Sequence, residues 1–242
     1  MICCARNNDL TRTCDTTSRT IKLCALVSGI ALIIACFNSF ARNPTRYKDG
    51  EEMIIPVVFE KNGNSSDLWS YLLQNRIIYL AGHIDPGMAD AIIGQLLYLE
   101  SQDREKDICL YINSPGGNVL SGMGIINAMN YVKPDVATFC VAQASSMASV
   151  ILSNGTPGKR FSFPIAEIMM HKISAGYYGK EPDVEIAAGR IIELNKLLVG
   201  MLAKNTGRTL DELMEVTDRD FFLNAQEAVD FGIIDAIIER SY

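Results

Sequence analysis

The sequence predicts an α/β fold built around a largely parallel sheet. Short apolar runs alternate with longer segments of helical periodicity, and each strand–helix unit takes up about 30 residues, as βαβ units do. The strand-like runs end at turns rich in Gly, Pro, Ser and Asn. With 242 residues, 48% of them hydrophobic, the chain is long enough to bury a sizeable core. Right-handed crossovers would stack the units into a spiral or an open sheet.

Two kinds of element follow one another from residue 76 onward. Short apolar runs predict strands at Arg76–Ala81, Asp107–Ile112, Ala137–Val141, Arg160–Phe163, Glu167–His171 and Ile233–Ile238. Longer segments with apolar residues at helical spacing predict helices at Met88–Glu100, Ser121–Tyr131, Ser146–Ser153, Glu181–Thr206, Thr209–Val216 and Ala225–Phe231. The helix over 181–206 carries more apolar positions than one face of a single subunit requires, and Gly207 is expected to end it.

Residues 1–50 differ from the rest of the chain in charge and cysteine content. They hold seven basic and three acidic side chains, a net charge of +4, whereas residues 51–242 carry −10. Five of the seven cysteines lie in the first 36 residues, at spacings that match no metal template. We therefore divide the chain into a leader, residues 1–50, and a body, residues 51–242.

The leader contains a charge-free, largely apolar segment over residues 23–41, which leaves three interpretations open. Ser39 and Ala41 are small residues of the kind found at signal-peptidase sites, so the leader is either a cleaved signal or an organelle-targeting peptide. The 19 uncharged residues are also just long enough for a retained membrane anchor. In the third interpretation the working protein begins at Met53. The expected location is the cytoplasm if Met53 is the start, and otherwise a plastid or mitochondrial lumen after cleavage.

The composition excludes several classes of protein. A disordered chain would have fewer apolar residues, and 18 Gly with 8 Pro are too few for a collagen-like chain. A net charge of −6 argues against nucleic-acid binding driven by overall charge. The two cysteines of the body, Cys109 and Cys140, lie in strand-like runs and are predicted to be small core residues.

Two strand-to-helix junctions are candidates for chemistry, because parallel folds place their sites at the carboxyl ends of strands. The first, over residues 114–118, pairs Gly116 with Gly117, whose exposed N–H groups would be able to stabilise a negatively charged oxygen. Such a Pro-Gly-Gly sequence is also common in simple turns. The second, over residues 143–148, places a serine at the start of an apolar helix, where it serves either as an N-cap or as a nucleophile.

A serine nucleophile needs a base, and the chain has two histidines. His83 follows Gly82 in a loop and is predicted to be a polar loop residue. His171 ends a predicted strand, a position open to the same edge of the sheet. The carboxylate that would orient the imidazole is not fixed by this reasoning, since the chain has 28 acidic residues.

From about Ile55 to Ile238, the body resembles the ClpP family, the proteolytic subunits of the ATP-dependent Clp serine protease. The resemblance rests on the runs KDICLYINSPGG over 106–117, KPDV over 133–136, GKRF over 158–161 and DRDFF over 218–222, together with the Ala-Ser-Met-like serine loop. It implies a ClpP/crotonase-type spiral of strand–helix–strand units with a protruding handle helix over 181–206.

The resemblance also implies a catalytic triad. The serine before Met maps to Ser146, the histidine 25 residues later to His171, and the aspartate a further 49 residues on to Asp220, all without a gap. The family's oxyanion hole maps to the N–H groups of Gly117 and Met147. A strand following His171, over residues 175–179, is expected to pair with an extended peptide substrate.

The remaining implications concern assembly and partners. Family members form two stacked seven-membered rings, of one subunit type or mixed with a second ClpP-type subunit, and degrade unfolded polypeptides delivered by a hexameric AAA+ ATPase. Arg219 would bridge the rings. The aromatic residues expected to form the pocket in which the ATPase docks are Tyr111, Tyr131, Phe139 and Phe161. ATP would be used by that partner, because this chain has no phosphate-binding loop of the Walker A type, and no metal or other cofactor is expected.

Three other functions compete with an active peptidase. The first is a catalytically weak, structural ring subunit that pairs with a second ClpP-type subunit. Two departures from the family pattern leave it open: Lys172-Ile173 stand where the family usually has Gln-Pro, and the 61–67 segment lacks the usual arginine-containing loop. A crotonase-like acyl-CoA enzyme would share the fold but has no use for the serine–histidine–aspartate register. A membrane-tethered signal-peptide peptidase would rely on a Ser–Lys pair, for which Lys172 is the candidate lysine.

Overall fold

The computed structural model describes residues 56–59, 63 and 65–238. The leader and its apolar segment, residues 23–41, lie outside the described residues, as do the predictions made for them. Among the described residues, no helix combines the length and the apolarity needed to cross a bilayer.

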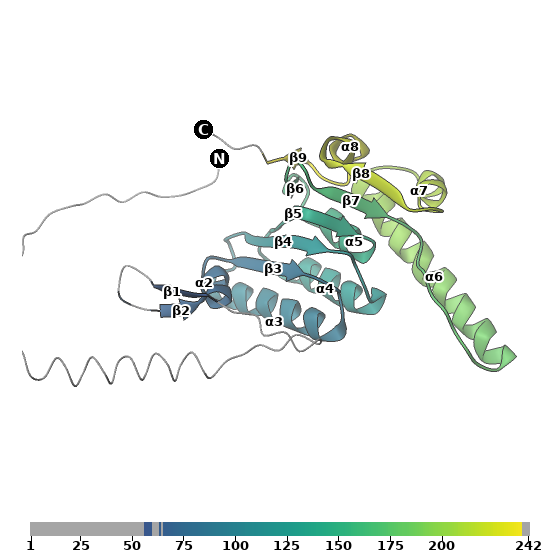
Figure 1. The fold of residues 1–242 in the computed structure, drawn as a ribbon, viewed down its shortest axis with the longest axis horizontal. Helices are drawn as coiled ribbons and strands as arrows, with labels where there is room; N and C mark the ends of the chain where they lie inside the picture. Colours follow the sequence, from purple (N-terminus) through teal and green to yellow (C-terminus); the bar gives the residue numbers. More distant parts are fainter. Residues whose placement is uncertain (1–55, 60–62, 64, 239–242) are drawn as a thin grey trace, which may run out of the picture. The chain divides into compact units, whose positions relative to one another are not determined.

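A seven-stranded sheet forms the centre of the body (Figure 1). Five of its strands are ordered β3 (Ile77–Ala81), β4 (Ile108–Ser114), β5 (Val136–Ser145), β6 (Arg160–Ser162) and β9 (Ala236–Ile237), and all neighbours in this series are parallel. The last residues of β5 pair in parallel with β7 (Glu167–Met170), which pairs antiparallel with β8 (Phe221–Asn224). The predicted α/β fold with a largely parallel sheet is confirmed.

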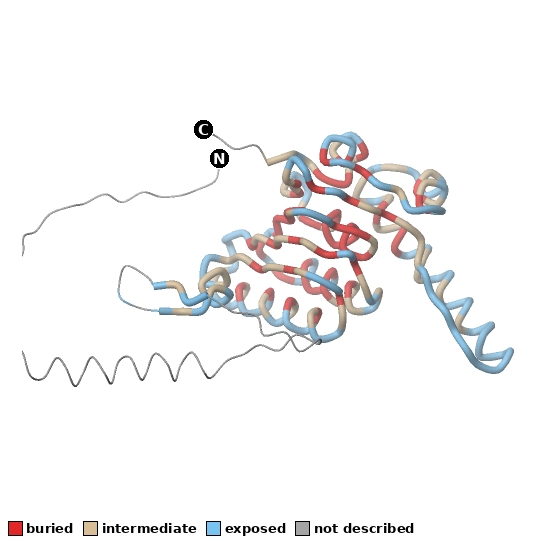
Figure 2. The backbone as a smooth tube through the Cα atoms, in the orientation of Figure 1, coloured by how far each residue is buried: buried red, intermediate tan, exposed pale blue. Residues whose placement is uncertain are grey.

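Three helices supply the core beside the sheet: α3 (Pro86–Gln102), α4 (Val119–Tyr131) and α5 (Met147–Ser153). Side chains alternate along β4, so that Ile108, Leu110 and Ile112 are fully buried in this core while the residues between them are half-buried. The carboxylate of Asp85 caps α3 by accepting a hydrogen bond from the Met88 N–H. The buried residues concentrate in the sheet and in these helices (Figure 2).

The longest helix, α6 (Glu181–Thr206), begins far from the core and ends in it. Most of its residues from 181 to 197 are exposed, whereas Leu198, Val199 and Leu202 are buried (Figure 2). Gly207, with a φ of +75°, ends the helix as predicted. The helices α7 (Leu210–Val216) and α8 (Ala225–Phe231) follow, with β8 between them.

Several short elements were not predicted, and some predicted bounds differ. The unpredicted elements are β1 (Val57–Phe59), β2 (Ser65–Asp67), α2 (Leu68–Gln74) and β8. The segment 233–238 contains only the two-residue strand β9, and β5 runs four residues beyond its predicted end. β6 and β7 each stop one residue before the predicted end, which leaves His171 just outside β7.

The expectation of a strand after His171 is wrong for the chain by itself. Residues 171–179 have no regular secondary structure, and most of those from 174 onward are exposed. A strand needs hydrogen-bonded neighbours, and no other strand among the described residues runs beside this segment.

Candidate active site

The sharp turn between β5 and α5 presents the Ser146 side chain. Ser146 has a φ of +56° and a ψ of −125°, a backbone conformation that a residue with a Cβ adopts only at a cost of about 1–3 kcal/mol. Its N–H donates to the Met169 carbonyl of β7 at 2.8 Å, and its carbonyl accepts from the Ser149 N–H at 3.0 Å and from the Ser149 hydroxyl at 2.6 Å. These bonds hold the strained turn in place and fix the direction of the Ser146 hydroxyl.

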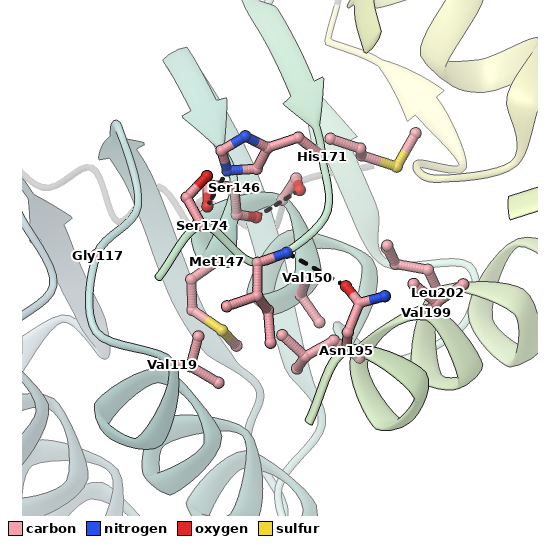
Figure 3. A pocket seen from close by; sticks show the side chains of 14 residues that line it. Gly117, Val119, Ser146, Met147, Val150, His171, Ser174, Asn195, Val199 and Leu202 are labelled. Carbon is pink, nitrogen blue, oxygen red and sulfur yellow. Dashed lines mark hydrogen bonds between the residues drawn. The ribbon is translucent and has the colours of Figure 1, made fainter. Parts of the chain in front are cut away.

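The antiparallel pairing of β7 with β8 brings a histidine and an aspartate together. Met170 pairs with Phe221, so His171 and Asp220 are neighbours just past the ends of the two strands. His171 Nε2 lies 2.8 Å from Ser146 Oγ (Figure 3), and His171 Nδ1 lies 3.1 Å from Asp220 Oδ1. A continuous hydrogen-bonded series thus joins three residues that are 25 and 49 positions apart in the sequence.

Lys172 points away from this series. Its Nζ donates to Asp218 Oδ1 at 2.6 Å, and its N–H donates to the Thr217 carbonyl at 2.9 Å. The hydrogen bond and charge of Lys172 lower the pKa of Asp218 below its ordinary value. Lys172 is therefore engaged with an aspartate and not with Ser146, which is the opposite of what a Ser–Lys peptidase requires.

The glycine loop after β4 lies against the serine turn. A Cβ on Gly116 would come within 2.6 Å of the Ser145 carbonyl oxygen, and one on Gly117 within 2.3 Å of the Ile84 carbonyl oxygen. Both glycines have positive φ, so a side chain is excluded by sterics as well as by conformation. The loop is anchored by the Ile84 N–H, which donates to the Gly116 carbonyl at 2.9 Å.

This close approach places Gly117 beside the serine and histidine in one cavity of about 220 Å³ (Figure 3). Gly117 and Met147, the residues expected to form an oxyanion hole, both line it together with Ser146 and His171. In the described part of the chain, the Gly117 N–H makes no hydrogen bond to another protein group. That leaves a backbone donor available beside the Ser146 hydroxyl.

The rest of the cavity is mainly apolar. Its apolar lining comes from α4, α5, α6, the end of β7 and the segment after β7, and consists of Val119, Val150, Met170, Ile173, Leu198, Val199 and Leu202. Asn195 of α6 also lines it and was not among the predicted site residues. The only signal for it in the sequence is a polar residue placed three and four positions before Leu198 and Val199, and therefore on the buried side of the helix.

The four aromatic residues expected in a docking pocket do not all come together. Tyr111 stacks on Phe139 at a ring-centroid distance of 4.6 Å, and Phe139 on Phe161 at 5.2 Å, across β4, β5 and β6. Tyr131 ends α4, is 77% exposed and forms no ring pair with any aromatic residue that the structure describes. The structure therefore groups three of the four residues on one face of the sheet.

The remaining candidates are exposed. Arg219 makes no salt bridge to any described residue, and His83 lies in the loop after β3, as expected of a polar loop residue. Within residues 56–59, 63 and 65–238, no group of three His, Cys, Asp or Glu side chains is placed to hold a metal ion.

Comparison with known families agrees with the geometry of the site. The family model described as Clp protease matches residues 60–241, which is most of the chain and includes every residue of the cavity. Such a match over more than half of the length establishes the family. The chain belongs to the Clp protease family, and its activity is that of a serine-type peptidase.

Proposed function

We propose that this chain is the proteolytic subunit of an ATP-dependent Clp protease, a serine endopeptidase with Ser146 as nucleophile, His171 as general base and Asp220 as the group that orients the imidazole. The observation that carries this proposal is the series of hydrogen bonds, 2.8 Å from Ser146 Oγ to His171 Nε2 and 3.1 Å from His171 Nδ1 to Asp220 Oδ1. Each distance is within the reach needed for proton transfer or orientation.

The first half of the reaction is acylation. Asp220 accepts a hydrogen bond from the Nδ1–H of His171, which leaves Nε2 unprotonated and ready to take a proton. Ser146 Oγ attacks the peptide carbonyl carbon while its proton passes to Nε2. The tetrahedral intermediate then breaks its C–N bond, the leaving amine takes the proton from Nε2, and an ester on Ser146 remains.

The oxygen that becomes negative in this intermediate needs hydrogen-bond donors. The N–H groups of Gly117 and Met147, which line the same cavity as Ser146, are the proposed donors. Loss of one such donor typically costs roughly 2.7–4 kcal/mol of transition-state stabilisation. Deacylation repeats the steps with water in place of Ser146, which regenerates the free hydroxyl and releases the second peptide.

The proposed assembly is two stacked heptameric rings that enclose these sites. Two features of the surface support it. The exposed part of α6, residues 181–197, carries Ile186, 72% exposed, and Ile192, 56% exposed. In the aromatic stack across β4–β6, Tyr111 and Phe161 are partly exposed on either side of the buried Phe139, which leaves two ring edges for a partner. The partner proposed for this aromatic stack is a hexameric AAA+ ATPase, which uses the ATP and delivers unfolded polypeptides. Arg219 is proposed to bridge the rings.

The test is peptide hydrolysis without ATP, by the wild type and by Ser146→Ala, each sized by gel filtration. We expect hydrolysis by the wild type, its loss in the variant, and a large ring assembly for both. A wild type that assembles but does not hydrolyse peptides would contradict the proposal and indicate a structural ring subunit that works with a second, active ClpP-type subunit. The proposed location is the cytoplasm if Met53 is the working start, and otherwise a plastid or mitochondrial lumen after cleavage of the leader.

A further inference from the structure

The segment between β7 and α6 is attached to the rest of the body at very few points. Residues 173–179 have no regular secondary structure, and the first two of them, Ile173 and Ser174, form a wall of the cavity. Among the described residues, they make a single hydrogen bond: the Ile173 N–H donates to Asn195 Oδ1 at 3.2 Å (Figure 3). The side chain of Ile173 also packs against the hydrophobic core, so Asn195 supplies the only hydrogen bond, among the described residues, that fixes the backbone of this wall.

Asn195 is held so that its oxygen faces the segment. Its Nδ2 lies 3.9 Å from the sulfur of Met214 in α7, a weak acceptor, which directs the amide nitrogen away from Ile173. The residue is half-buried and precedes the buried pair Leu198 and Val199 on the same side of α6. Its carbonyl oxygen is thus a fixed acceptor at the inner end of the exposed helix.

The hydrogen bond between Ile173 and Asn195 positions the wall of the cavity and does not involve the hydrogen bonds among Ser146, His171 and Asp220. Ile173 and Ser174 line the cavity with Ser146, whereas His171 is held independently by its bonds to Ser146 and Asp220 and by the pairing of β7 with β8. Loss of this bond would therefore free the backbone of Ile173 while the bonds of His171 to Ser146 and Asp220 remain.

We propose that Asn195 is a positioning residue that holds the Ile173–Ser174 wall of the cavity in place, and so sets how strictly the enzyme selects the side chain before the scissile bond. This proposal rests on the proposed function, because it takes the cavity beside Ser146 as the one that receives that side chain. Asn195 itself acts through Ile173 and takes no part in the bond-making steps.

The test compares Asn195→Ala with two other variants of the full chain. Asn195→Asp keeps a carboxylate oxygen as acceptor for the Ile173 N–H. Asn205→Ala is the matched control, because Asn205 is also a half-buried asparagine of α6 but bonds Ser153, at 3.2 Å, outside the cavity. Each protein is assayed with two short fluorogenic peptides, one with Leu and one with Ala before the scissile bond, and with a small fluorophosphonate that labels the nucleophile without filling the cavity.

We expect Asn195→Ala to lower kcat/KM for the Leu peptide about tenfold, in line with an unsatisfied hydrogen-bonding group. The preference for Leu over Ala falls, while the fluorophosphonate reacts with Ser146 at a rate within about twofold of the wild type. Asn195→Asp restores the preference. Asn205→Ala lowers Tm and leaves the preference unchanged.

Two results would overturn the proposal: an unchanged preference in Asn195→Ala, or an equal loss of preference and of fluorophosphonate reactivity, which would place the effect on the nucleophile or on folding.

A double variant tests whether the two residues act through the same hydrogen bond. Ile173→Pro removes the N–H donor, so adding Asn195→Ala to it must have no further effect on the preference. Failure of the proposed function has a different signature, because the wild type itself would then not be labelled at Ser146.

Discussion

Two carboxylates close together in the sequence have different partners in the structure. Asp220 is bonded to His171 Nδ1 at 3.1 Å, whereas Asp218, two residues earlier, is bonded to Lys172 Nζ at 2.6 Å. Both side chains are more than half exposed, so exposure does not distinguish them. Their hydrogen-bond partners distinguish them, because only Asp220 contacts His171, the proposed general base.

This difference makes a residue-scale prediction. We expect Asp220→Asn to lower kcat for peptide hydrolysis by roughly 10³–10⁴-fold, because an amide does not hold the imidazole in the tautomer with a free Nε2. Asp218→Asn is the matched control, and we expect less than about a tenfold change, as for the loss of one exposed ion pair. Steady-state kinetics with a short peptide measure both. Similar losses in the two variants would contradict the role of Asp220.

Among the elements, the long central strand β5 organises the site. It pairs with β4 along most of its length, its first half also pairs with β6 and its last residues with β7, and it leads directly into the Ser146 turn. Arg160, the first residue of β6, connects that strand to Asp235 in the segment before β9. Its Nε and Nη2 donate to Asp235 at 3.0 and 2.5 Å, and its Nη1 donates to the Asn205 carbonyl of α6 at 2.8 Å.

The ion pair of Arg160 with Asp235 gives a prediction at the scale of these elements. Burial raises the pKa of Asp235, but the hydrogen bonds from Arg160 outweigh it, so the pKa lies below its ordinary value of 3.8. A lowered pKa stabilises the fold above the ordinary value, and that contribution is lost as the pH falls through the pKa of the folded state. We expect Asp235→Asn to lower the free energy of unfolding by about 1–3 kcal/mol at pH 7, since Arg160 is left almost buried without its counter-ion.

Urea unfolding at pH 7 and near pH 3 measures this effect, with Asp230→Asn as control for an exposed carboxylate on α8. The difference between the wild type and Asp235→Asn is expected to shrink at the lower pH. An undiminished difference there would show that the lost stability does not come from the charge of Asp235.

The sequence predicted elements of clear periodicity and missed those defined by distant partners. The helices over 88–100 and 181–206 and the strand in 107–112 are strongly patterned, and the structure contains all three. β8 is four residues long and exists because it pairs with β7, some 50 positions earlier, which no local pattern reports. The strand expected over 175–179 is missing for the same reason, since no strand among the described residues pairs with this segment.

Site residues differ in the same way. The spacing of Ser146, His171 and Asp220 was readable through the family resemblance, and the structure brings the three together. The positive φ of Ser146 was not readable, because the surrounding bonds to Met169 and Ser149 impose it. Asn195 gave only a weak signal, since its role depends on where the segment after β7 lies.

At the scale of the whole molecule, one end of the body remains largely uncovered. The first two thirds of α6 are mostly exposed and carry several apolar side chains, and the adjoining segment carries Tyr178, which is fully exposed. Surface of this kind is costly in water and is typical of a contact between subunits. Arg219 is also exposed, next to Asp220, with no salt bridge to any of the residues described here.

We therefore expect Arg219→Ala to weaken the contact between rings. The predicted result is a shift from double to single rings and a parallel loss of peptide hydrolysis, measured by sedimentation velocity and steady-state kinetics. Arg104→Ala is the control, because Arg104, which lies just beyond the end of α3, is an exposed arginine that pairs with Glu100 of that helix. Intact double rings in Arg219→Ala would contradict the bridging role.

The most direct test of the account is the identity of the nucleophile. Intact-protein and peptide mass spectrometry after treatment with a fluorophosphonate locates the labelled residue in the wild type, in Ser146→Ala and in Ser145→Ala, whose target is the neighbouring serine in β5. The account predicts a single label on Ser146 in the wild type and in Ser145→Ala, and none in Ser146→Ala. A label that persists in Ser146→Ala, or an unlabelled wild type, would contradict the assignment of Ser146 as the nucleophile.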